Sequence, residues 1–101
     1  MKIIEKEKNR PYILALDFDN TIVYNDFPEA GILKEGAKEI INKLYDEGFY
    51  IIIWTSRYIP EHIKIASDFL KINGVKFHVF NDNYPELDYK PWPKIYYDLL
   101  R

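Results

Sequence analysis

The sequence contains no cysteine and only two histidines, His62 and His78, among its 101 residues. Without cysteine there are no disulfide bonds, no thiolate zinc sites and no cysteine nucleophiles. Two histidines are also too few for a histidine-rich metal centre. We expect His62 on a helix surface and His78 packed within a strand. A metal in this protein would be held by oxygen atoms, which favours Mg²⁺ or Ca²⁺.

The sequence also lacks a charge surplus and a long apolar run. Its net charge is −2, so no basic excess indicates nucleic-acid binding. The longest apolar run, residues 49–54, is far shorter than the roughly 20 residues that cross a bilayer. Residues 1–8 mix both charge signs and lack the apolar core of a secretory signal. We therefore expect a cytoplasmic protein without a membrane partner.

Short apolar runs alternate with helical patterns, and this order predicts one α/β domain over residues 1–101. The alternation predicts a mostly parallel sheet with right-handed crossovers. Strands are expected at residues 12–16, 49–54, 75–80 and 95–100, and helices at residues 34–47 and 60–73. Residues 20–33 should be irregular and residues 81–93 should form a loop. The first helix is expected to bury Ala37, Ile40, Ile41 and Leu44, which recur at helical spacing.

Polar residues directly follow three of the expected strands. Ligands bind beyond the carboxyl ends of strands in open parallel sheets, so residues 17–21, 55–57 and 81–83 are the candidate site. Asp17 and Asp19 would repel each other unless a cation or a shared proton intervenes. They suit a carboxylate nucleophile beside an acid/base residue, bridged by a divalent cation. The alternatives are a pair of loop acids or a helix N-cap.

The other polar residues at the strand ends have two interpretations each. Thr55 and Ser56 could hold phosphoryl oxygens through hydroxyl and backbone N–H groups, or cap the helix that follows. Arg57 could bind an anionic substrate or pair with a nearby acid. Asn81 and Asn83 could line the pocket or form a turn.

The segment Asp17-Phe18-Asp19-Asn20-Thr21 resembles the first motif of the haloacid dehalogenase (HAD) superfamily, Asp-x-Asp-x-Thr after a hydrophobic strand. Residues 51–55 resemble its second motif, a hydrophobic strand that ends in Thr or Ser. The resemblance is greatest to small bacterial and phage HAD-like hydrolases and covers about residues 12–100. It implies the Rossmann-like three-layer fold of this superfamily, without a cap domain. Three further segments carry the resemblance: residues 27–31 (FPEAG), 54–57 (WTSR) and 81–86 (NDNYPE).

The resemblance implies a Mg²⁺-dependent phosphohydrolase that cleaves a phosphomonoester through an aspartyl phosphate. Asp17 would attack phosphorus, while Asp19 would protonate the leaving oxygen and then deprotonate the hydrolytic water. The Asp17 carboxylate and the Asp19 backbone carbonyl would bind Mg²⁺. Members without a cap commonly act on large substrates or use a neighbouring subunit as a lid, so the identity of the phosphorylated substrate stays open.

The resemblance also implies several groups that bind the transferring phosphoryl group. Thr55 would form a hydrogen bond to it, and the backbone N–H groups of Phe18 and Ser56 would assist. A lysine of the third motif would neutralise charge on the nucleophile and the phosphoryl oxygens. Lys94 matches the family pattern of a lysine shortly before a Tyr-x-Asp strand, and Lys90 is the alternative.

The fourth motif of the family, an acidic pair that completes the Mg²⁺ site, is missing from this sequence. Asp98 is the only late acid, and it lies inside the expected last strand rather than at its end. The chain is therefore either truncated relative to the family or a catalytically impaired phosphate-binding or regulatory protein. In both cases Mg²⁺ affinity should be low, and an uncovered last strand would favour a homo-oligomer. A receiver domain fits less well, because its phosphorylated aspartate lies on a later strand than its metal-binding acids.

Overall fold

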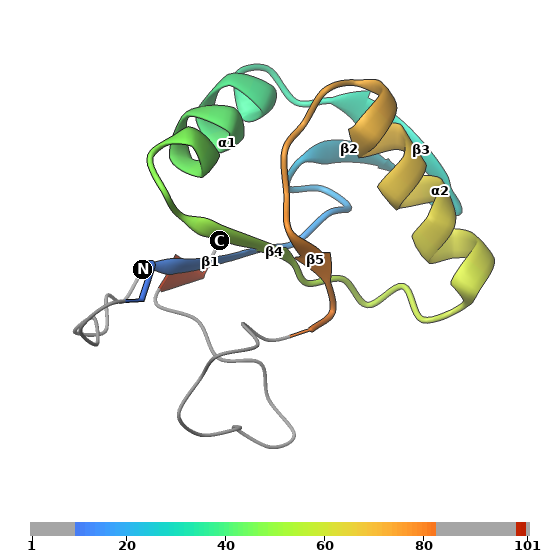
Figure 1. The fold of residues 1–101 in the computed structure, drawn as a ribbon. Coiled ribbons are helices and arrows are strands. Elements are labelled where there is room, and N and C mark those ends of the chain that lie inside the picture. Colours follow the sequence, from blue (N-terminus) through green and yellow to red (C-terminus); the bar gives the residue numbers. More distant parts are fainter. Residues whose placement is uncertain (1–9, 83–98, 101) are drawn as a thin grey trace.

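The computed structural model describes residues 10–82 and 99–100, which contain a parallel sheet, two helices and a hairpin (Figure 1). The sheet has the strand order β5-β4-β1-β6, and each neighbouring pair is parallel. These elements confirm the predicted α/β class. The strands are β1 (Ile13–Leu16), β4 (Tyr50–Ile53), β5 (Val79–Phe80) and β6 (Leu99–Leu100), and the helices are α1 (Ala37–Asp46) and α2 (Pro60–Ile72).

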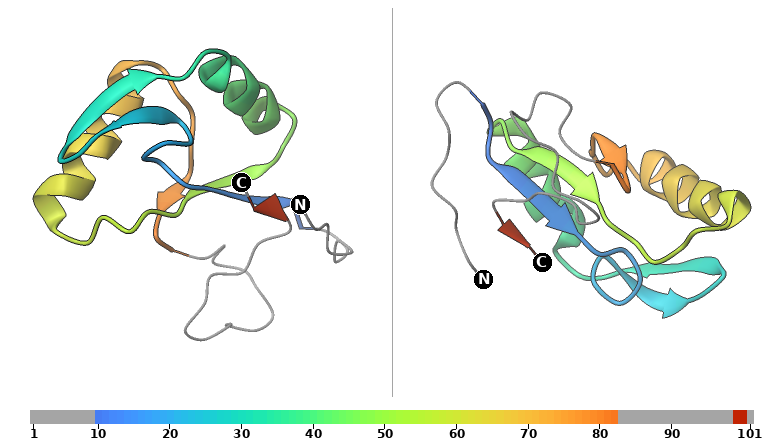
Figure 2. Two further views of the ribbon diagram at one scale, coloured as in Figure 1. Left: turned by 180° about the vertical axis from the view of Figure 1, so that it is seen from behind. Right: turned by 90° about the horizontal axis from the view of Figure 1, so that it is seen from below.

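Both described helices lie on one face of the sheet, as Figures 1 and 2 show. The chain steps from β1 through α1 to β4, and then in the same direction through α2 to β5. Right-handed crossovers that step in one direction place their helices on the same face. The predicted third layer, on the other face, stays a prediction.

Strands β1 and β4 are apolar along their whole length because both of their faces are covered. Leu14, Leu16 and Ile53 belong to the main hydrophobic core, together with Ile41 of α1 and Leu70 of α2. The alternate residues of the same strands point to the opposite face and are fully buried as well: Ile13, Ala15 and Ile52. This double burial explains why the strands appear in the sequence as continuous apolar runs instead of alternating ones.

The prediction that residues 20–33 are irregular was wrong. They contain an antiparallel hairpin of β2 (Val23–Asp26) and β3 (Glu29–Leu33), which follows the carboxyl end of β1 and packs β3 against α2 (Figure 2). Gly31, which resembles a chain breaker, has a packing reason to be glycine. A Cβ atom there would lie 1.8 Å from the carbonyl oxygen of Tyr24, so the two strands approach each other only without a side chain.

Two further expectations were wrong in detail. Ile40, predicted to be buried on the first helix, is 62% exposed, whereas Ile41 of the same helix lies in the core. The third strand is limited to Val79–Phe80. Before it, the N–H group of Lys76 donates to the Asn42 side chain and that of Val75 donates to the Leu70 carbonyl, so these residues do not extend the ladder. Of the expected fourth strand only Leu99–Leu100 lies within the described residues. No helix in the described ranges has the length and apolarity needed to cross a membrane.

His78 lies at the sheet edge directly before β5, not within a strand as predicted, and its side chain is partly exposed although it makes specific contacts. Its Nδ1 atom accepts a hydrogen bond of 2.9 Å from the backbone N–H of Ile51. The imidazole stacks on the rings of Tyr45 and Tyr50, with centroid distances of 4.6 and 4.3 Å. Burial lowers the pKa of His78 below its ordinary value of 6.5. A proton on Nδ1 would also face the Ile51 N–H group and displace this hydrogen bond.

This environment predicts a pH-dependent stability. Because the pKa of His78 is lower in the folded than in the unfolded chain, the unfolded chain binds more protons below about pH 6.5. The contribution of His78 is therefore fully present above pH 6.5 and is lost as the pH falls toward the folded pKa. In His78→Asn an amide oxygen can still accept the Ile51 hydrogen bond but does not titrate. Urea unfolding at pH 7.5 and 5.5 should show a larger loss of stability for the wild type than for the variant; equal losses would contradict this account.

Candidate active site

Three chain segments meet at the carboxyl edge of the sheet. The register of β1 and β4 ends with Leu16 opposite Ile53, and the backbone N–H of Trp54 donates a hydrogen bond of 2.8 Å to the Leu16 carbonyl. Asp17 and Thr55 therefore follow at the same edge. Asn81 follows β5, and its N–H group donates to the Ile53 carbonyl at 2.9 Å. The structure thus brings together the described parts of the three segments named from the sequence.

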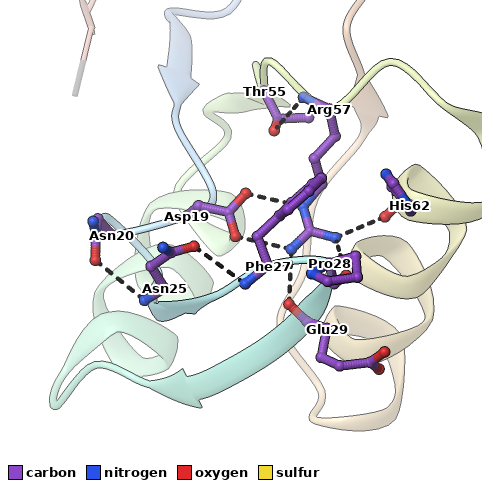
Figure 3. Close-up of polar contacts among 9 residues, drawn as sticks. All are labelled: Asp19, Asn20, Asn25, Phe27, Pro28, Glu29, Thr55, Arg57 and His62. Carbon is purple, nitrogen blue, oxygen red and sulfur yellow. Dashed lines mark hydrogen bonds and ion pairs between the residues drawn. The ribbon is translucent and has the colours of Figure 1, made fainter.

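An ion pair between Asp19 and Arg57 lies at the centre of this edge (Figure 3). Arg57 Nε donates to one carboxylate oxygen of Asp19 at 2.9 Å, and Nη2 donates to the other at 2.8 Å. Arg57 is only 2% exposed, although its chain neighbours Ser56 and Tyr58 are both exposed. A guanidinium this deeply buried needs a partner, and the two-pronged contact supplies one with well-defined geometry.

The remaining N–H groups of Arg57 bind backbone carbonyls from two other segments. Nη1 donates to the carbonyls of Pro28 and His62 at 2.8 and 2.9 Å, and Nη2 donates to the carbonyl of Glu29 at 2.9 Å. With the Asp19 contacts, these bonds use all five guanidinium donors. Arg57 therefore ties the end of β1, the turn of the hairpin and the first turn of α2 to the loop after β4.

From the sequence, Arg57 could bind an anionic substrate or pair with a nearby acid. In the described structure Arg57 pairs with an acid, Asp19. The face of the guanidinium also lies against the rings of Phe18 and Phe27, each 5.1 Å from the Arg57 carbon to the ring centroid. Binding of a substrate anion by Arg57 stays a prediction, and it would require Arg57 to exchange one of its present acceptors.

The loop after β4 is held by its own side chains. The Thr55 hydroxyl oxygen, which is buried, accepts a hydrogen bond of 3.2 Å from the Arg57 backbone N–H. The Thr55 N–H group donates to the Asn81 side-chain oxygen at 2.8 Å. Asn81 has a φ of 51°, a left-handed conformation that asparagine adopts more readily than most residues. Asn81 thus braces this loop from the end of β5, while Ser56 remains exposed.

The two aspartates have different surroundings although they are two residues apart. Asp17 is exposed, and the Phe18 backbone N–H bonds to its carboxylate. Partial burial and the negative charge of Asp19 raise the pKa of Asp17, and the Phe18 hydrogen bond opposes this shift. Asp19 is half-buried and held by Arg57. The Phe18 N–H group, expected to bind a phosphoryl oxygen, therefore contacts the Asp17 carboxylate here.

The tight turn after β1 leaves oxygen atoms available for a metal. Phe18 accepts backbone hydrogen bonds from residues 21–23 through its carbonyl, whereas no N–H group of the described residues donates to the Asp19 carbonyl. The Asp17 carboxylate and this carbonyl are the two donors predicted for Mg²⁺, and both are oxygen atoms. Within residues 10–82, no cluster of three acidic, histidine or cysteine residues is present. The predicted site residues Lys94 and Asn83, and the alternative residues Lys90 and Asp98, lie outside the described residues.

A pocket of about 470 Å³ opens beside Asp19. Sequence reasoning missed most of its wall, including the exposed rings of Phe27 and Tyr58. The ring of His62, expected only on a helix surface, lies edge-on to that of Phe27 at 4.9 Å. The pocket is lined by Asp19, Asn25, Phe27, Ser56, Arg57, Tyr58, Ile59 and His62. Phe27 begins one matched segment and Tyr58 directly follows another, but nothing in their spacing indicates that a hairpin brings them together.

The buried ion pair of Arg57 predicts that Arg57→Lys lowers the free energy of unfolding much more than a substitution in an exposed ion pair. Arg57→Lys removes the two-pronged contact with Asp19 and leaves buried carbonyls without donors, so unfolding free energy should fall by about 2–3 kcal/mol. The control is Lys64→Gln, which breaks the exposed pair of Lys64 with Asp68 and should change stability by less than about 0.5 kcal/mol. Urea unfolding measures both. Equal effects of the two substitutions would show that Arg57 does not stabilise the site as described.

The comparisons with known proteins give one match. No family model and no curated protein matches the sequence. A solved structure of a conserved protein from Bacteroides thetaiotaomicron is similar, with 30% sequence identity and a TM-score of 0.78. The similarity covers 90% of this chain and 74% of that protein. Because the similarity reaches 30% identity and covers most of both chains, the protein belongs to the same family as this conserved Bacteroides protein.

Proposed function

We propose that the protein is a Mg²⁺-dependent phosphohydrolase of the HAD superfamily that cleaves a phosphomonoester through an aspartyl phosphate. One observation carries the proposal. Asp17 and Asp19 follow the inner strand β1 with distinct surroundings, at the same edge of the sheet as Thr55, which follows β4. An exposed carboxylate next to one that is anchored by an ion pair suits a nucleophile paired with an acid/base residue.

In the proposed reaction, a carboxylate oxygen of Asp17 attacks phosphorus, and the bond between phosphorus and the leaving oxygen breaks. For this step Asp19 must first take up a proton from solvent, which it then gives to the leaving oxygen, so that the leaving group departs as an alcohol. Asp19 then takes a proton from water, whose oxygen attacks the phosphorus of the aspartyl phosphate. This second step releases inorganic phosphate and restores both aspartates. A carboxylate offers about four acceptor positions, so Asp19 can exchange protons while it remains bonded to Arg57.

Thr55 suits the stabilisation of the transferring group. Its hydroxyl oxygen accepts the Arg57 backbone N–H, which leaves the hydroxyl proton free to be donated to a phosphoryl oxygen. The exposed Ser56 follows directly, and its backbone N–H group would assist in binding a phosphoryl oxygen. Lys94 remains the predicted cation for the same phosphoryl oxygens.

The oxygen donors at the end of β1 fit Mg²⁺. The Asp17 carboxylate and the Asp19 backbone carbonyl would hold the ion, which supplies positive charge to offset the repulsion between the nucleophile and the phosphate. Since only these two donors are identified among the described residues, binding should be weak, and isothermal titration calorimetry should find a dissociation constant well above micromolar. Micromolar affinity would mean that a further acid, such as Asp82 or Asp98, completes the site.

The alternative function is a phosphate-binding or regulatory protein of the same superfamily without turnover. The observation in its favour is that no third acid joins Asp17 and Asp19 within residues 10–82. Such a protein would keep the pocket at the strand ends but would lack the charge needed to activate the phosphate. The two functions differ in one measurable property, which is the release of inorganic phosphate.

Asp17→Asn should abolish Mg²⁺-dependent phosphate release from p-nitrophenyl phosphate, because an amide cannot act as the nucleophile. Its thermal unfolding curve should stay close to that of the wild type, since Asp17 is exposed. Asp68→Asn is the matched control on the exposed surface of α2 and should retain full activity. A chelator should stop turnover in the wild type and in the control.

The outcomes separate the two functions. Turnover that requires Mg²⁺ and Asp17 supports the phosphohydrolase. Turnover that persists in Asp17→Asn removes Asp17 from the role of nucleophile. Folded wild-type protein without turnover above the variant supports the phosphate-binding alternative.

A further inference from the structure

The pocket beside Asp19 is built from three separate segments around a group of aromatic rings. The hairpin contributes Phe27, the loop after β4 contributes Tyr58, and α2 contributes His62. Figure 3 shows Phe27 beside the Arg57 guanidinium, with His62 approaching from α2. The pocket volume, about 470 Å³, lies in the range of sites that hold small molecules.

Two of these rings are largely exposed to solvent, so packing in the hydrophobic core does not account for them. Phe27 is 52% exposed and Tyr58 is 83% exposed, yet both lie in the wall of the same pocket. Scattered apolar side chains on a surface need no explanation, but several rings around one concave site indicate a binding surface. Aromatic walls favour an aromatic ligand, because rings pack in offset or edge-on arrangements that add to the burial of apolar area.

The charged groups of the pocket leave little attraction for an ionic ligand. Asp19 and Arg57 are the acidic and basic residues that line it, and they bind each other with both carboxylate oxygens engaged. The other guanidinium donors are bonded to backbone carbonyls. Recognition of the leaving group in this pocket therefore depends more on contact with the aromatic rings than on ionic attraction.

We propose that this pocket binds the leaving group of the phosphomonoester and that this leaving group carries an aromatic ring. The inference rests on the proposed function, in which Asp19 protonates the leaving oxygen. That step requires the oxygen to lie within about 3 Å of the Asp19 carboxylate. Because Asp19 forms part of the pocket wall, the rest of the leaving group extends toward Phe27, Tyr58 and His62.

The test compares three phosphate esters of primary alcohols, which are benzyl, cyclohexylmethyl and ethyl phosphate. Their leaving oxygens are chemically alike, so differences in kcat/KM report mainly on the group in the pocket. Benzyl phosphate should exceed ethyl phosphate by about tenfold or more, because a ring is removed from water. It should exceed cyclohexylmethyl phosphate by about threefold, the part that aromatic contacts add.

Variants locate the effect in the pocket. Tyr58→Leu and Phe27→Leu should lower the ratio of kcat/KM for benzyl over ethyl phosphate at least about threefold. Tyr58 is the safer position, because its high exposure makes a folding defect from Tyr58→Leu unexpected. Tyr24→Leu is the matched control: Tyr24 is 57% exposed on the same hairpin but lines a different hollow, on the side of β3 and α2. It should leave the ratio unchanged.

The results distinguish failure of this inference from failure of the proposed function. Equal kcat/KM for the three esters, with turnover still dependent on Mg²⁺ and Asp17, would overturn the aromatic leaving group alone. Equal values for the benzyl and cyclohexylmethyl esters would also overturn it, because the pocket would then select only for apolar size. Absence of turnover with all esters would contradict the phosphohydrolase.

In that last case binding decides the role of the pocket. Calorimetry with benzylphosphonate and ethylphosphonate, which resist hydrolysis, compares the same two groups without chemistry. Tighter binding of benzylphosphonate that is lost in Tyr58→Leu would support an aromatic subsite. Equal binding of the two phosphonates would overturn it.

Discussion

The buried guanidinium of Arg57 is the constraint on which the rest of the site depends. A charge that is only 2% exposed is unfavourable unless every donor is paired, and the chain meets this demand with five hydrogen bonds. The acceptors are the Asp19 carboxylate and three backbone carbonyls from the hairpin and α2. The hydrogen bonds of this one side chain therefore fix the positions of three segments relative to one another: the turn after β1, the hairpin and the first turn of α2.

The same interaction determines both halves of the candidate site. It holds the Asp19 carboxylate at a set position beside the exposed Asp17, which gives two neighbouring carboxylates different environments. It also fixes the hairpin turn, so that Phe27 faces the loop after β4 and closes one side of the pocket. The buried pair of Arg57 and Asp19 thus determines both the position of the acid/base residue and the shape of the adjoining pocket.

Much of this fold is readable from the sequence, because it follows from local patterns. Apolar runs buried on both faces predict β1 and β4, helical spacing predicts α1 and α2, and the strand-end rule predicts where Asp17 and Thr55 meet. The hairpin was missed because its strands are short and largely exposed and contain Gly31, whose role is a close backbone approach. The wall of the pocket was missed because its rings meet only through long-range folding. Lys94, which the family resemblance implies as the lysine that binds the phosphoryl group, lies outside the described residues.

Sequence separation gives the Arg57 network a further consequence, for the order in which the protein folds. Its partners lie 38, 29, 28 and 5 positions away along the chain, so most of these bonds close large loops. Such contacts form only after β1 and β4 have paired, since until then the loss of chain entropy is not offset. The hairpin should therefore dock late. Once docked, it should open together with the start of α2 as one cooperative unit, with common protection of its amides against hydrogen exchange.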